Sequence, residues 1–374
     1  MADKEVVILG VGCTKFGRMT GRNPRDMARE AGLMALKDAG VDFRDIQMGF
    51  CGHCNQPLGA GTACFAELGM TGIPVTNVEV ACTSESRGVM LAADMIAAGV
   101  YDMCMIIGVE KMPRGLVPLG DMSDAPYELS IGLMPMPGAY AMMAQRHMYD
   151  YGTKVEHFAK AAEIGHRNGS LNSNATYQKV FSLEEIMSST MVADPITILE
   201  SSANCDGATA TIVCSKERAK RYTTKPVLMT GWAGGTPMYV KGEPALLEGP
   251  VEMLGEKVYE MSGLGSEDID VAQFHDAFSP GIIFCLEELQ FCPKGEGGPF
   301  VWEGNIEIGG KLPVNTDGGL VSCGHPIGAT GGRMIYEISL QLRGQAGSRQ
   351  VKDAKVGMLL NQGLGGTTCE TFKI

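Results

Sequence analysis

Two stretches far apart in this chain follow the same pattern. Residues 37–53 read KDAGVDFRDIQMGFCGH, and residues 260–278 read EMSGLGSEDIDVAQFHDAF. Each predicts a helix that ends at a glycine, a short loop with an acid followed by isoleucine, and a strand that leads into a histidine-containing turn. We therefore expect two similar halves, residues 1–218 and 222–374.

The repeat continues beyond both stretches. ACTSESRGVMLAADMIAAG, from Ala81, and CGHPIGATGGRMIYEISLQL, from Cys323, both read as a strand end, a turn of small residues and an amphipathic helix. YDMCMIIGVEKM and AKVGMLLNQGLGG then both read as a strand that leads into a glycine-bearing loop. A pseudo-twofold arrangement would bring the two small-residue turns together where the halves join.

Apolar runs alternate with helical segments, as in EVVILGVG followed by RDMAREAGLMALKDAG, and this predicts an α/β fold with buried strands. The 374 residues, 45% of them hydrophobic, can bury a large core. Residues 112–197 are rich in Met, Pro and Gly and have no counterpart in the second half, so we interpret them as an inserted loop subdomain. We expect one helix there from near Pro137 and another that ends at Gly169. The methionines could fill the core or face a ligand.

Charge and composition argue against several classes of protein. The formal net charge of −12 disfavours a nucleic-acid surface, which needs clustered Lys and Arg. No apolar stretch approaches a membrane span, and the start MADKEVVILGVG does not read as a signal peptide. The 12 cysteines sit within apolar runs, which is typical of buried thiols in a reducing compartment. We expect a soluble cytoplasmic protein.

Cys82 is the strongest candidate nucleophile. It follows the strand-like TNVEVA and precedes a helix, so its sulfur would lie at a helix N-terminus, where free N–H groups and the helix dipole lower a thiol pKa. The alternative is a buried structural cysteine. His325 lies in the second small-residue turn, with Pro326 suited to the first turn of the following helix. The repeat pairs this turn with that of Cys82, which makes His325 a candidate base for the thiol.

Other stretches carry weaker signals. FHDAFSP places His275 and Asp276 at a strand end, and NQGLGGTTC offers Asn361 and a glycine-rich turn whose N–H groups could form an oxyanion hole. GHPIGATG lacks the lysine and spacing of a phosphate-binding loop. CGHC at residues 51–54 is not followed by a helix-forming stretch, as a redox motif requires, and lacks two further zinc ligands. We interpret it as a lining of the active-site turn or a subunit contact, and we expect no bound metal.

Together these elements resemble the thiolase family over essentially the full chain. The resemblance rests on VACTSES around Cys82, HDAF at His275, GHPIGATG at His325 and the C-terminal NQGLGG. Biosynthetic thiolases carry Asn-Glu-Ala-Phe where this chain has HDAF. The HDAF block is similar to that of the sterol-carrier-type subgroup and its bacterial and archaeal relatives.

The resemblance implies the thiolase fold, in which two βαβαβαββ halves form a five-layered αβαβα sandwich, and a homodimer or a dimer of dimers. It also implies an acyltransferase with coenzyme A as co-substrate and no tightly bound cofactor. Cys82 would attack the 3-oxo carbonyl of a 3-oxoacyl-CoA and become acylated, and CoA would then take the acyl group. His325 would activate Cys82 and, with His275, stabilise the enolate oxyanion. The N–H groups of Cys82 and Gly363 would hold the tetrahedral oxyanion.

The chain departs from the family at the second cysteine, which acts as an acid/base. Many members carry it in a C-terminal Cys-x-Gly turn, where this chain has Asn361, and sterol-carrier-type members carry it after His-Asp, where this chain has Ala277. Cys323 is the obvious substitute, because alternate residues of an extended stretch face the same side and His325 follows at that spacing. If Cys323 is structural instead, the acid/base could be water or His275, or Claisen chemistry could be impaired.

The leading hypothesis is therefore a degradative 3-oxoacyl-CoA thiolase. The Met-rich insertion suggests a bulky, branched or aromatic acyl group, as in lipid or aromatic degradation. A decarboxylating condensing enzyme such as a ketoacyl synthase and a non-catalytic acyl-CoA-binding subunit are the alternatives. The resemblance also implies a small zinc-ribbon/OB-fold acyl-CoA-associated partner protein. The loop region agrees with this expectation because it has no evident basic patch for the CoA phosphates: Lys111 and Arg114 are nearly the only cations before Arg146.

Overall fold

A nine-stranded sheet forms the centre of the protein. The computed structural model describes residues 4–113, 136–222, 225–237 and 250–374. The strands lie in the order β3-β2-β4-β7-β1-β8-β11-β10-β9. Their bounds are β1 Val6–Cys13, β2 Met48–Gly52, β3 Val75–Val78, β4 Met103–Glu110, β7 Gly207–Ser215, β8 Val227–Gly235, β9 Val271–Phe274, β10 Val356–Gly363 and β11 Gly366–Lys373.

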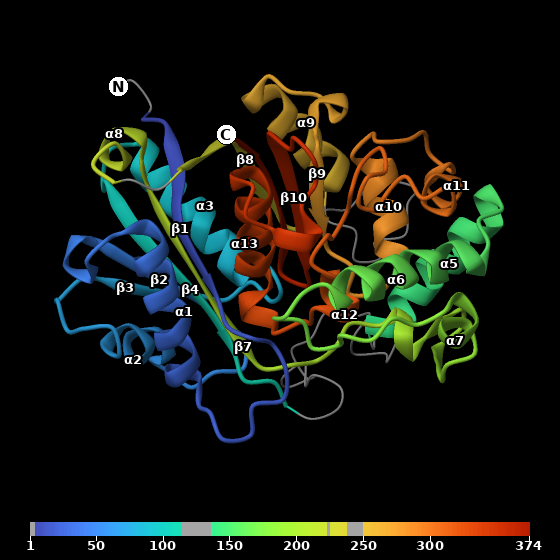
Figure 1. The fold of residues 1–374 in the computed structure, drawn as a ribbon, viewed down its shortest axis with the longest axis horizontal. Helices are drawn as coiled ribbons and strands as arrows, with labels where there is room; N and C mark the ends of the chain where they lie inside the picture. The colour runs from blue at the N-terminus through green and yellow to red at the C-terminus, as the bar shows by residue number, and fades with distance from the viewer. Residues whose placement is uncertain (1–3, 114–135, 223–224, 238–249) are drawn as a thin grey trace.

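The sheet has two halves that follow the same plan. In one half β2 and β4 are parallel, and β7 pairs antiparallel with both β4 and β1. In the other half β9 and β10 are parallel, and β11 pairs antiparallel with both β10 and β8. The halves are joined through β1 and β8 by residues Val6–Ile8 against Val227–Met229. This short junction lets the sheet fold around the two helices α3 (Ser84–Ala97) and α13 (Thr330–Arg343), which lie between the halves (Figure 1).

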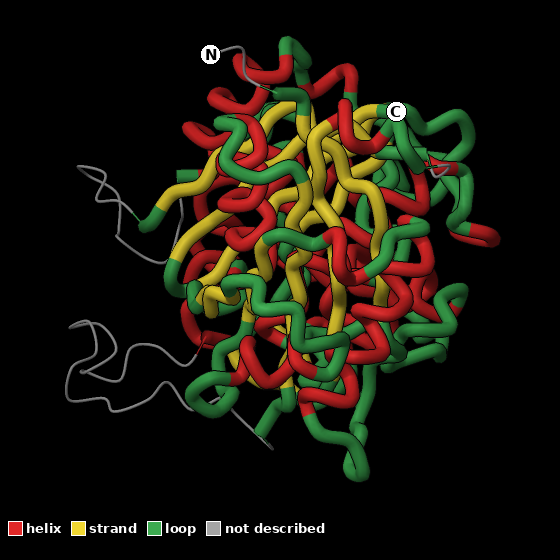
Figure 2. Tube along the Cα trace, turned by 90° about the vertical axis from the view of Figure 1, so that its left-hand side faces the viewer, coloured by secondary structure: helices red, strands yellow, loops and turns green. Residues whose placement is uncertain are grey.

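Helices also cover the outer faces of both halves, which makes five layers. Helices α1 (Pro24–Ala39) and α2 (Ala60–Ala66) pack on the first half, and α9 (Val251–Ser262) and α10 (Pro280–Glu288) on the second. Figure 2 shows the strands in the interior with helices on either side. The predicted α/β fold with a five-layered αβαβα sandwich is confirmed.

Strand β4 shows why the strands read as continuous apolar runs. Met105 and Ile107 belong to an outer apolar cluster with α1, whereas Cys104 and Ile106 point into the central cluster with α3 and α13. Both faces of the strand are therefore buried, and neither carries the polar residues that mark a solvated face.

The repeated pattern folds as expected. Helix α1 ends at Gly40 with φ 66°, and α9 ends at Gly263 with φ 68°. Each is followed by a 3₁₀ turn, at Phe43–Asp45 and Ser266–Asp268 respectively, and then by a strand, β2 or β9. Glycine is required at both ends because a left-handed backbone strains residues with a Cβ.

The inserted region contains the expected helices. They are α5 (Met136–Tyr151) and α6 (Val155–Ser170), so the predicted start near Pro137 and end at Gly169 are each confirmed within one residue. Most of the Met-, Pro- and Gly-rich stretch, with Arg114, lies outside the described residues. No helix within the described ranges has both the length and the hydropathy needed to span a bilayer. The remaining elements are α7 Leu183–Met187, β5 Met191–Ala193, β6 Ile196–Thr197, α8 Lys216–Ala219, α11 Gly297–Trp302 and α12 Gly319–Ser322.

In the central layer, the buried carboxyl groups of Glu85 and Glu370 have no direct cationic partner among the described residues. Glu85, in the first turn of α3, accepts hydrogen bonds from the Thr209 hydroxyl and from the Gly332 nitrogen at 3.0 Å. Neither carboxyl oxygen of Glu370, on β11, has a hydrogen-bond partner among the described residues. Burial raises the pKa of each carboxyl to about 8. In the folded protein both carboxyl groups therefore stay protonated up to about pH 8 and ionise only above it.

This predicts a stability that falls with pH. Between the unfolded pKa near 4.5 and the folded pKa near 8, the unfolded state has released a proton that the folded state keeps. Each such group then costs about 1.4 kcal/mol per pH unit. We expect Glu370→Gln to make the decline shallower by about that slope, measured by urea unfolding from about pH 5 to pH 8. Glu256→Gln, at an exposed position of α9, is the control, and equal slopes in wild type and Glu370→Gln would contradict the prediction.

Candidate active site

The two small-residue turns meet at the N-terminal ends of α3 and α13. A Cβ added to Gly331 would lie 2.6 Å from the Ser86 nitrogen, and one added to Gly52 would lie 2.6 Å from the Glu85 nitrogen. Real Cβ atoms do not approach so closely, so both backbones depend on glycine there. The contact places the Cys82 sulfur 3.3 Å from His325 Nε2, across 243 residues of sequence. The expectation that the repeat pairs these two turns is confirmed.

A tight turn holds Cys82. Ala81 has the left-handed φ of 48°, Thr83 is the N-cap, and α3 begins at Ser84. The Ser84 hydroxyl accepts from the Val80 nitrogen at 3.0 Å and donates to the Ala81 carbonyl at 2.6 Å. Cys82 itself is half-buried, so its sulfur is held in place yet accessible to a reactant.

His325 is oriented as a base toward this sulfur. Its Nδ1 lies 2.7 Å from the Thr330 hydroxyl, which donates its own hydrogen to the Pro326 carbonyl at 3.2 Å. Thr330 must therefore accept from Nδ1–H, which leaves the Nε2 lone pair facing Cys82. Burial, then the neighbouring His275 and Arg333, lower the pKa of His325 well below its usual value. The imidazole is neutral and can take a proton.

His275 completes the cluster from the C-terminal end of β9. Its ring meets the His325 ring edge-on, with centroids 5.4 Å apart. The Cys82 sulfur and one ring nitrogen of each histidine lie within 4.8 Å of one another. Burial lowers the pKa of His275 to about 4, so it too is neutral. The same three atoms have the spacing of a three-ligand metal site, and the expectation of no bound metal stays a prediction.

The thiol differs from the sequence-based expectation. We expected the helix N-terminus to lower its pKa, but desolvation raises the pKa of Cys82 to about 12, and the acids Glu110 and Glu79 contribute. The expectation was wrong because burial of the sulfur outweighs the backbone hydrogen bond at the turn, which by itself lowers the pKa. The resting site therefore holds a thiol beside a neutral imidazole rather than a thiolate–imidazolium pair.

Gly363, at the end of β10, lies beside the nucleophile. A Cβ there would be 2.9 Å from the Cys82 nitrogen and 3.3 Å from the Cys82 Cβ, so a larger residue would displace the turn. The structure thus brings Gly363 together with Cys82, His275 and His325. The assignment of the Gly363 and Cys82 N–H groups to an oxyanion hole stays a prediction.

Cys323 is not brought into this cluster. The expected extended turn is wrong, because Cys323 caps α12 with helical angles, φ −62° and ψ −47°. Its sulfur accepts from the Asn172 side chain at 3.5 Å and lies in a buried cluster with Cys13 and Cys205. Burial raises the pKa of Cys323 well above its usual value. Its proposed acid/base role therefore has no geometric support.

The CGHC stretch lies beside the nucleophile turn. The Cys54 sulfur is 3.2 Å from the Ala81 carbonyl oxygen. Glu110, which sequence reasoning missed, ties this stretch to the second half: its carboxylate accepts from the nitrogens of Cys54, Asn55 and Gly328, each at 2.9 Å. The sequence did offer one sign of this role: Glu110 is an acid at the end of a strand, just before a loop that the repeat matches to the NQGLGG loop. Thr330 was also missed, although it lies within GHPIGAT.

An apolar cluster borders the site next to His275. Its buried members include Tyr140, Ala277, Phe278 and Leu320, and the rings of Tyr140 and Phe278 lie 5.0 Å apart. Ala277 is part of this wall, so the position that holds a cysteine in sterol-carrier-type relatives is apolar here. These side chains give the site an apolar border on the side of His275.

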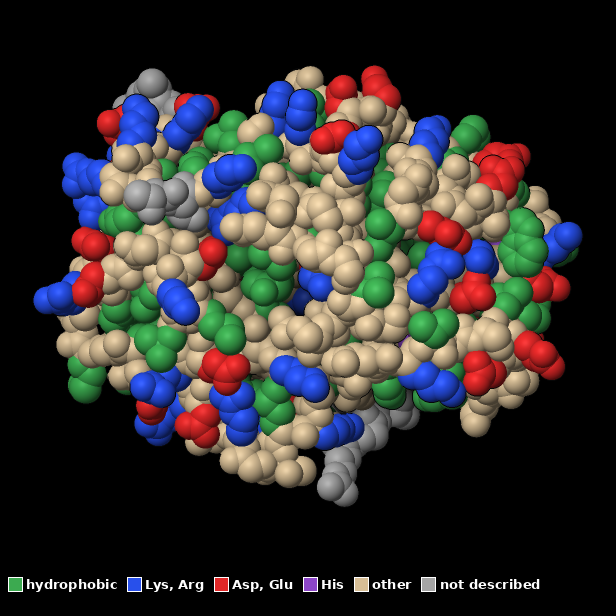
Figure 3. All heavy atoms as spheres, viewed as in Figure 1, with side chains coloured by type: hydrophobic (Ala, Val, Ile, Leu, Met, Phe, Trp, Pro, Cys, Tyr) green, Lys and Arg blue, Asp and Glu red, His purple; other side chains and the backbone are tan. Residues whose placement is uncertain are grey.

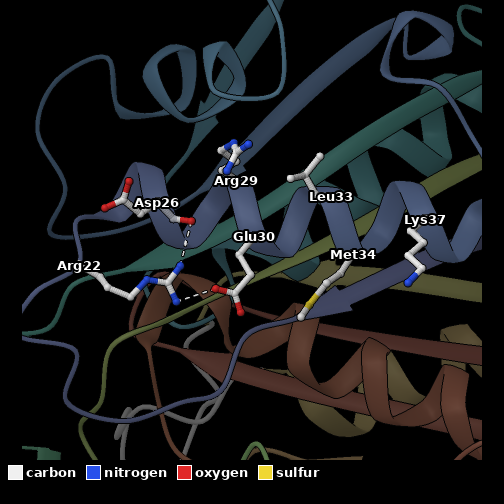
Figure 4. A pocket seen from close by; sticks show the side chains of 7 residues that line it. All are labelled: Arg22, Asp26, Arg29, Glu30, Leu33, Met34 and Lys37. Carbon is white, nitrogen blue, oxygen red and sulfur yellow. Dashed lines mark hydrogen bonds and ion pairs between the residues drawn. The ribbon is translucent and has the colours of Figure 1, made fainter.

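The surface hollow and the charged side chains away from the Cys82–His275–His325 cluster contribute no further residue to the site. A surface hollow runs along the outer face of α1, where Arg22 pairs with Glu30 at 2.6 Å (Figure 4). Lys111, one of the few cations near the inserted region, pairs with Asp206 at 2.7 Å. Acidic and basic side chains are interspersed over the face drawn in Figure 3.

Comparisons with known proteins agree with this geometry. Residues 6–217 match the family described as thiolase, N-terminal domain, and residues 236–373 match that described as thiolase C-terminal domain-like. An acetyl-CoA acetyltransferase of Methanothermobacter thermautotrophicus is 39% identical over 97% of this chain and 98% of its own. Bovine sterol carrier protein 2 is 35% identical over 98% of this chain and 72% of its own. A structure described as an Ltp2-ChsH2(DUF35) aldolase superposes with a TM-score of 0.88 at 28% identity, covering 100% of this chain and 98% of the other.

The protonated thiol predicts the pH dependence of alkylation. Below the pKa of about 12, the thiolate fraction of Cys82 rises about tenfold per pH unit. We expect iodoacetamide labelling of Cys82, followed by peptide mass spectrometry, to accelerate by roughly that factor per unit between about pH 6 and pH 9. Cys54, whose pKa burial also raises, is the internal comparison. A rate independent of pH, as a thiolate–imidazolium pair would produce, would contradict the prediction.

Proposed function

The chain belongs to the thiolase family of acyltransferases, and we propose that it transfers the acyl group of a 3-oxoacyl-CoA through Cys82, by CoA-dependent cleavage or the reverse condensation. The observation that carries the proposal is the 3.3 Å contact between the Cys82 sulfur and the unprotonated Nε2 of His325. A thiol with a raised pKa needs such a base at the moment of attack.

The first half-reaction follows from this contact. His325 Nε2 takes the thiol proton while the Cys82 sulfur attacks the 3-oxo carbon. The C2–C3 bond then breaks, its electron pair stays on the departing acyl-CoA as an enolate, and the acyl group stays on the sulfur. The enolate takes the proton from His325 at C2 and leaves as the acyl-CoA that contains C1 and C2, while the shortened acyl group waits on Cys82 for CoA. Backbone N–H groups at Cys82 and Gly363 would stabilise the tetrahedral oxyanion.

We further propose a degradative role on a bulky, branched or aromatic acyl group, and the apolar surroundings of the site support the choice of acyl group. The wall formed by Tyr140, Phe278 and Leu320 is apolar and lies next to the histidine pair. An aromatic wall stabilises a ring or branched chain through packing that a two-carbon acyl group cannot make.

A carbon–carbon lyase is the second candidate. The observation that favours it is the likeness, over the whole chain, to a structure described as an aldolase. A retro-aldol cleavage releases an aldehyde or ketone and needs neither free CoA nor an acyl-enzyme. The two candidates therefore differ in their requirement for Cys82.

We also propose a homodimer. Strand β3 is an edge of the nine-stranded sheet, and its Thr76 and Asn77 are exposed. Edge strands with unpaired backbone groups are ready to pair with a second copy. Because β3 leads directly into the Cys82 turn, such pairing would also support the nucleophile.

A small acyl-CoA-associated zinc-ribbon/OB-fold partner is a further proposal. It is supported by the likeness to the structure described as an Ltp2-ChsH2(DUF35) aldolase, and by the ion pair that Lys111, one of the few cations near the inserted region, forms with Asp206. Full turnover by the purified chain alone would contradict a required partner.

The acyl-enzyme gives the direct test of function. Incubation with a panel of linear, branched and aromatic 3-oxoacyl-CoAs, followed by intact-mass spectrometry, should show one added acyl group on the wild type. We expect Cys82→Ala to retain none, and Cys54→Ala to be acylated at close to the wild-type rate. Products formed without CoA and without any adduct would favour the lyase instead, and dependence on a malonyl thioester would favour a decarboxylating condensing enzyme.

The edge strand gives the test of oligomeric state. Thr76→Lys would place a charge on each copy at the paired edge, so we expect it to shift the population from dimer to monomer in sedimentation velocity. Thr190→Lys, in a loop of the inserted region, is the control. A wild-type protein that is monomeric at micromolar concentration would contradict the proposal.

A further inference from the structure

We propose that Asn361 is a positioning residue that holds the hydrogen of His275 on Nδ1, and that His275 Nε2 is thereby the second acid/base of acyl transfer. This inference rests on the proposed function. It addresses the absence of both cysteines that the family uses for this step: Asn361 and Ala277 stand at their positions, and the sulfur of Cys323 lies elsewhere.

The orientation of the Asn361 amide follows from its neighbours. Its nitrogen donates to the Cys82 carbonyl at 2.9 Å and to the Ser86 hydroxyl at 3.2 Å. A carbonyl oxygen can only accept, and Ser86 directs its own hydrogen to the Thr83 carbonyl at 3.1 Å. The Thr368 hydroxyl also donates to Ser86, at 2.9 Å. The amide nitrogen must therefore face this side, and Oδ1 must face away from it.

That orientation assigns the hydrogen of His275. Asn361 Oδ1 lies 2.8 Å from His275 Nδ1, and as an acceptor it requires the hydrogen on Nδ1. A neutral ring then carries a lone pair on Nε2, which has no hydrogen-bond partner among the described residues. Such a nitrogen accepts a proton. In its resting state it does not supply the oxyanion hydrogen bond that the family resemblance implied.

The charges around His275 keep it in this state. Cys82 and His325 face it from the turns before α3 and α13, and both are uncharged at rest. Arg333, on α13, disfavours a second positive charge nearby. The adjacent Asp276 directs its carboxylate to the Leu320 nitrogen at 2.7 Å rather than to the ring. Burial then favours the neutral imidazole.

The second half-reaction uses this base. His275 Nε2 takes the proton of the CoA thiol, and the CoA sulfur attacks the acyl carbon on Cys82. The bond between that carbon and the Cys82 sulfur breaks, and its electron pair stays on the Cys82 sulfur. That sulfur then takes the proton from His275 Nε2. One proton has moved from CoA to Cys82, and both histidines are neutral again.

The test separates the two half-reactions. Acylation is followed by intact mass with a 3-oxoacyl-CoA that acylates the wild type, and deacylation by adding CoA to the isolated acyl-enzyme. We expect Asn361→Ala and His275→Ala to acylate within about threefold of wild type but to deacylate about 10²-fold more slowly, the usual contribution of general acid–base catalysis. Asn305→Ala, far from the site, should change neither rate. Equal slowing of both steps in Asn361→Ala would overturn the inference.

A pH profile distinguishes positioning from a structural role. Asn361→Asp keeps an acceptor beside His275 Nδ1 but adds a negative charge, which should raise the pKa of His275 by about one to three. Because the base must be unprotonated, the acid limb of the deacylation rate should move upward by that amount, whereas Asn305→Asp should leave it in place. If the acid limb of Asn361→Asp stays where it is in wild type, the inference is overturned and the proposed function still stands. A wild type that never acylates Cys82 overturns the proposed function and the inference with it.

Discussion

The contact between the N-terminal ends of α3 and α13 is the constraint on which the site depends. Gly331, at the start of α13, lets the two helices approach until it faces Ser86, and Gly52, at the end of β2, lets the start of α3 pack closely on the first half of the sheet. The nucleophile and its base come from opposite halves of the chain, so their 3.3 Å spacing is set by packing between halves. Glu110 adds a polar link across the same join through the nitrogens of Cys54 and Gly328. A buried carboxylate held by backbone donors is rigid, because each lost hydrogen bond would leave an unsatisfied charge.

Much of this could be predicted from the sequence because repeats and strand–turn–helix patterns are local signals. The glycine ends at Gly40 and Gly263, the buried strands and the pairing of the turns around Cys82 and His325 all follow from such patterns. Protonation states did not follow, because they depend on burial and on neighbours distant in sequence. The Cys82 thiol shows this: its position before a helix suggested a thiolate, whereas desolvation favours the thiol.

The expectation that Cys323 is the second acid/base was wrong for a related reason. Its spacing from His325 was readable, but the side to which its sulfur points depends on whether the backbone there is extended or helical, and the four-residue helix α12 was not evident from the sequence. Asn361 illustrates the converse. The sequence showed only a missing cysteine, whereas the three-dimensional arrangement shows an amide whose two ends are assigned by the Cys82 carbonyl and by His275.

The protonated resting thiol has a consequence for survival of the enzyme between turnovers. Peroxides and other electrophiles attack the thiolate, and the sulfinic and sulfonic products of over-oxidation are not readily repaired. The Cys82 sulfur gives up its proton only when a substrate lies against Cys82 and His325. While the site is empty the sulfur therefore stays a thiol, which reacts slowly with such reagents. The arrangement that delays activation until binding therefore also acts as chemical protection of the sulfur.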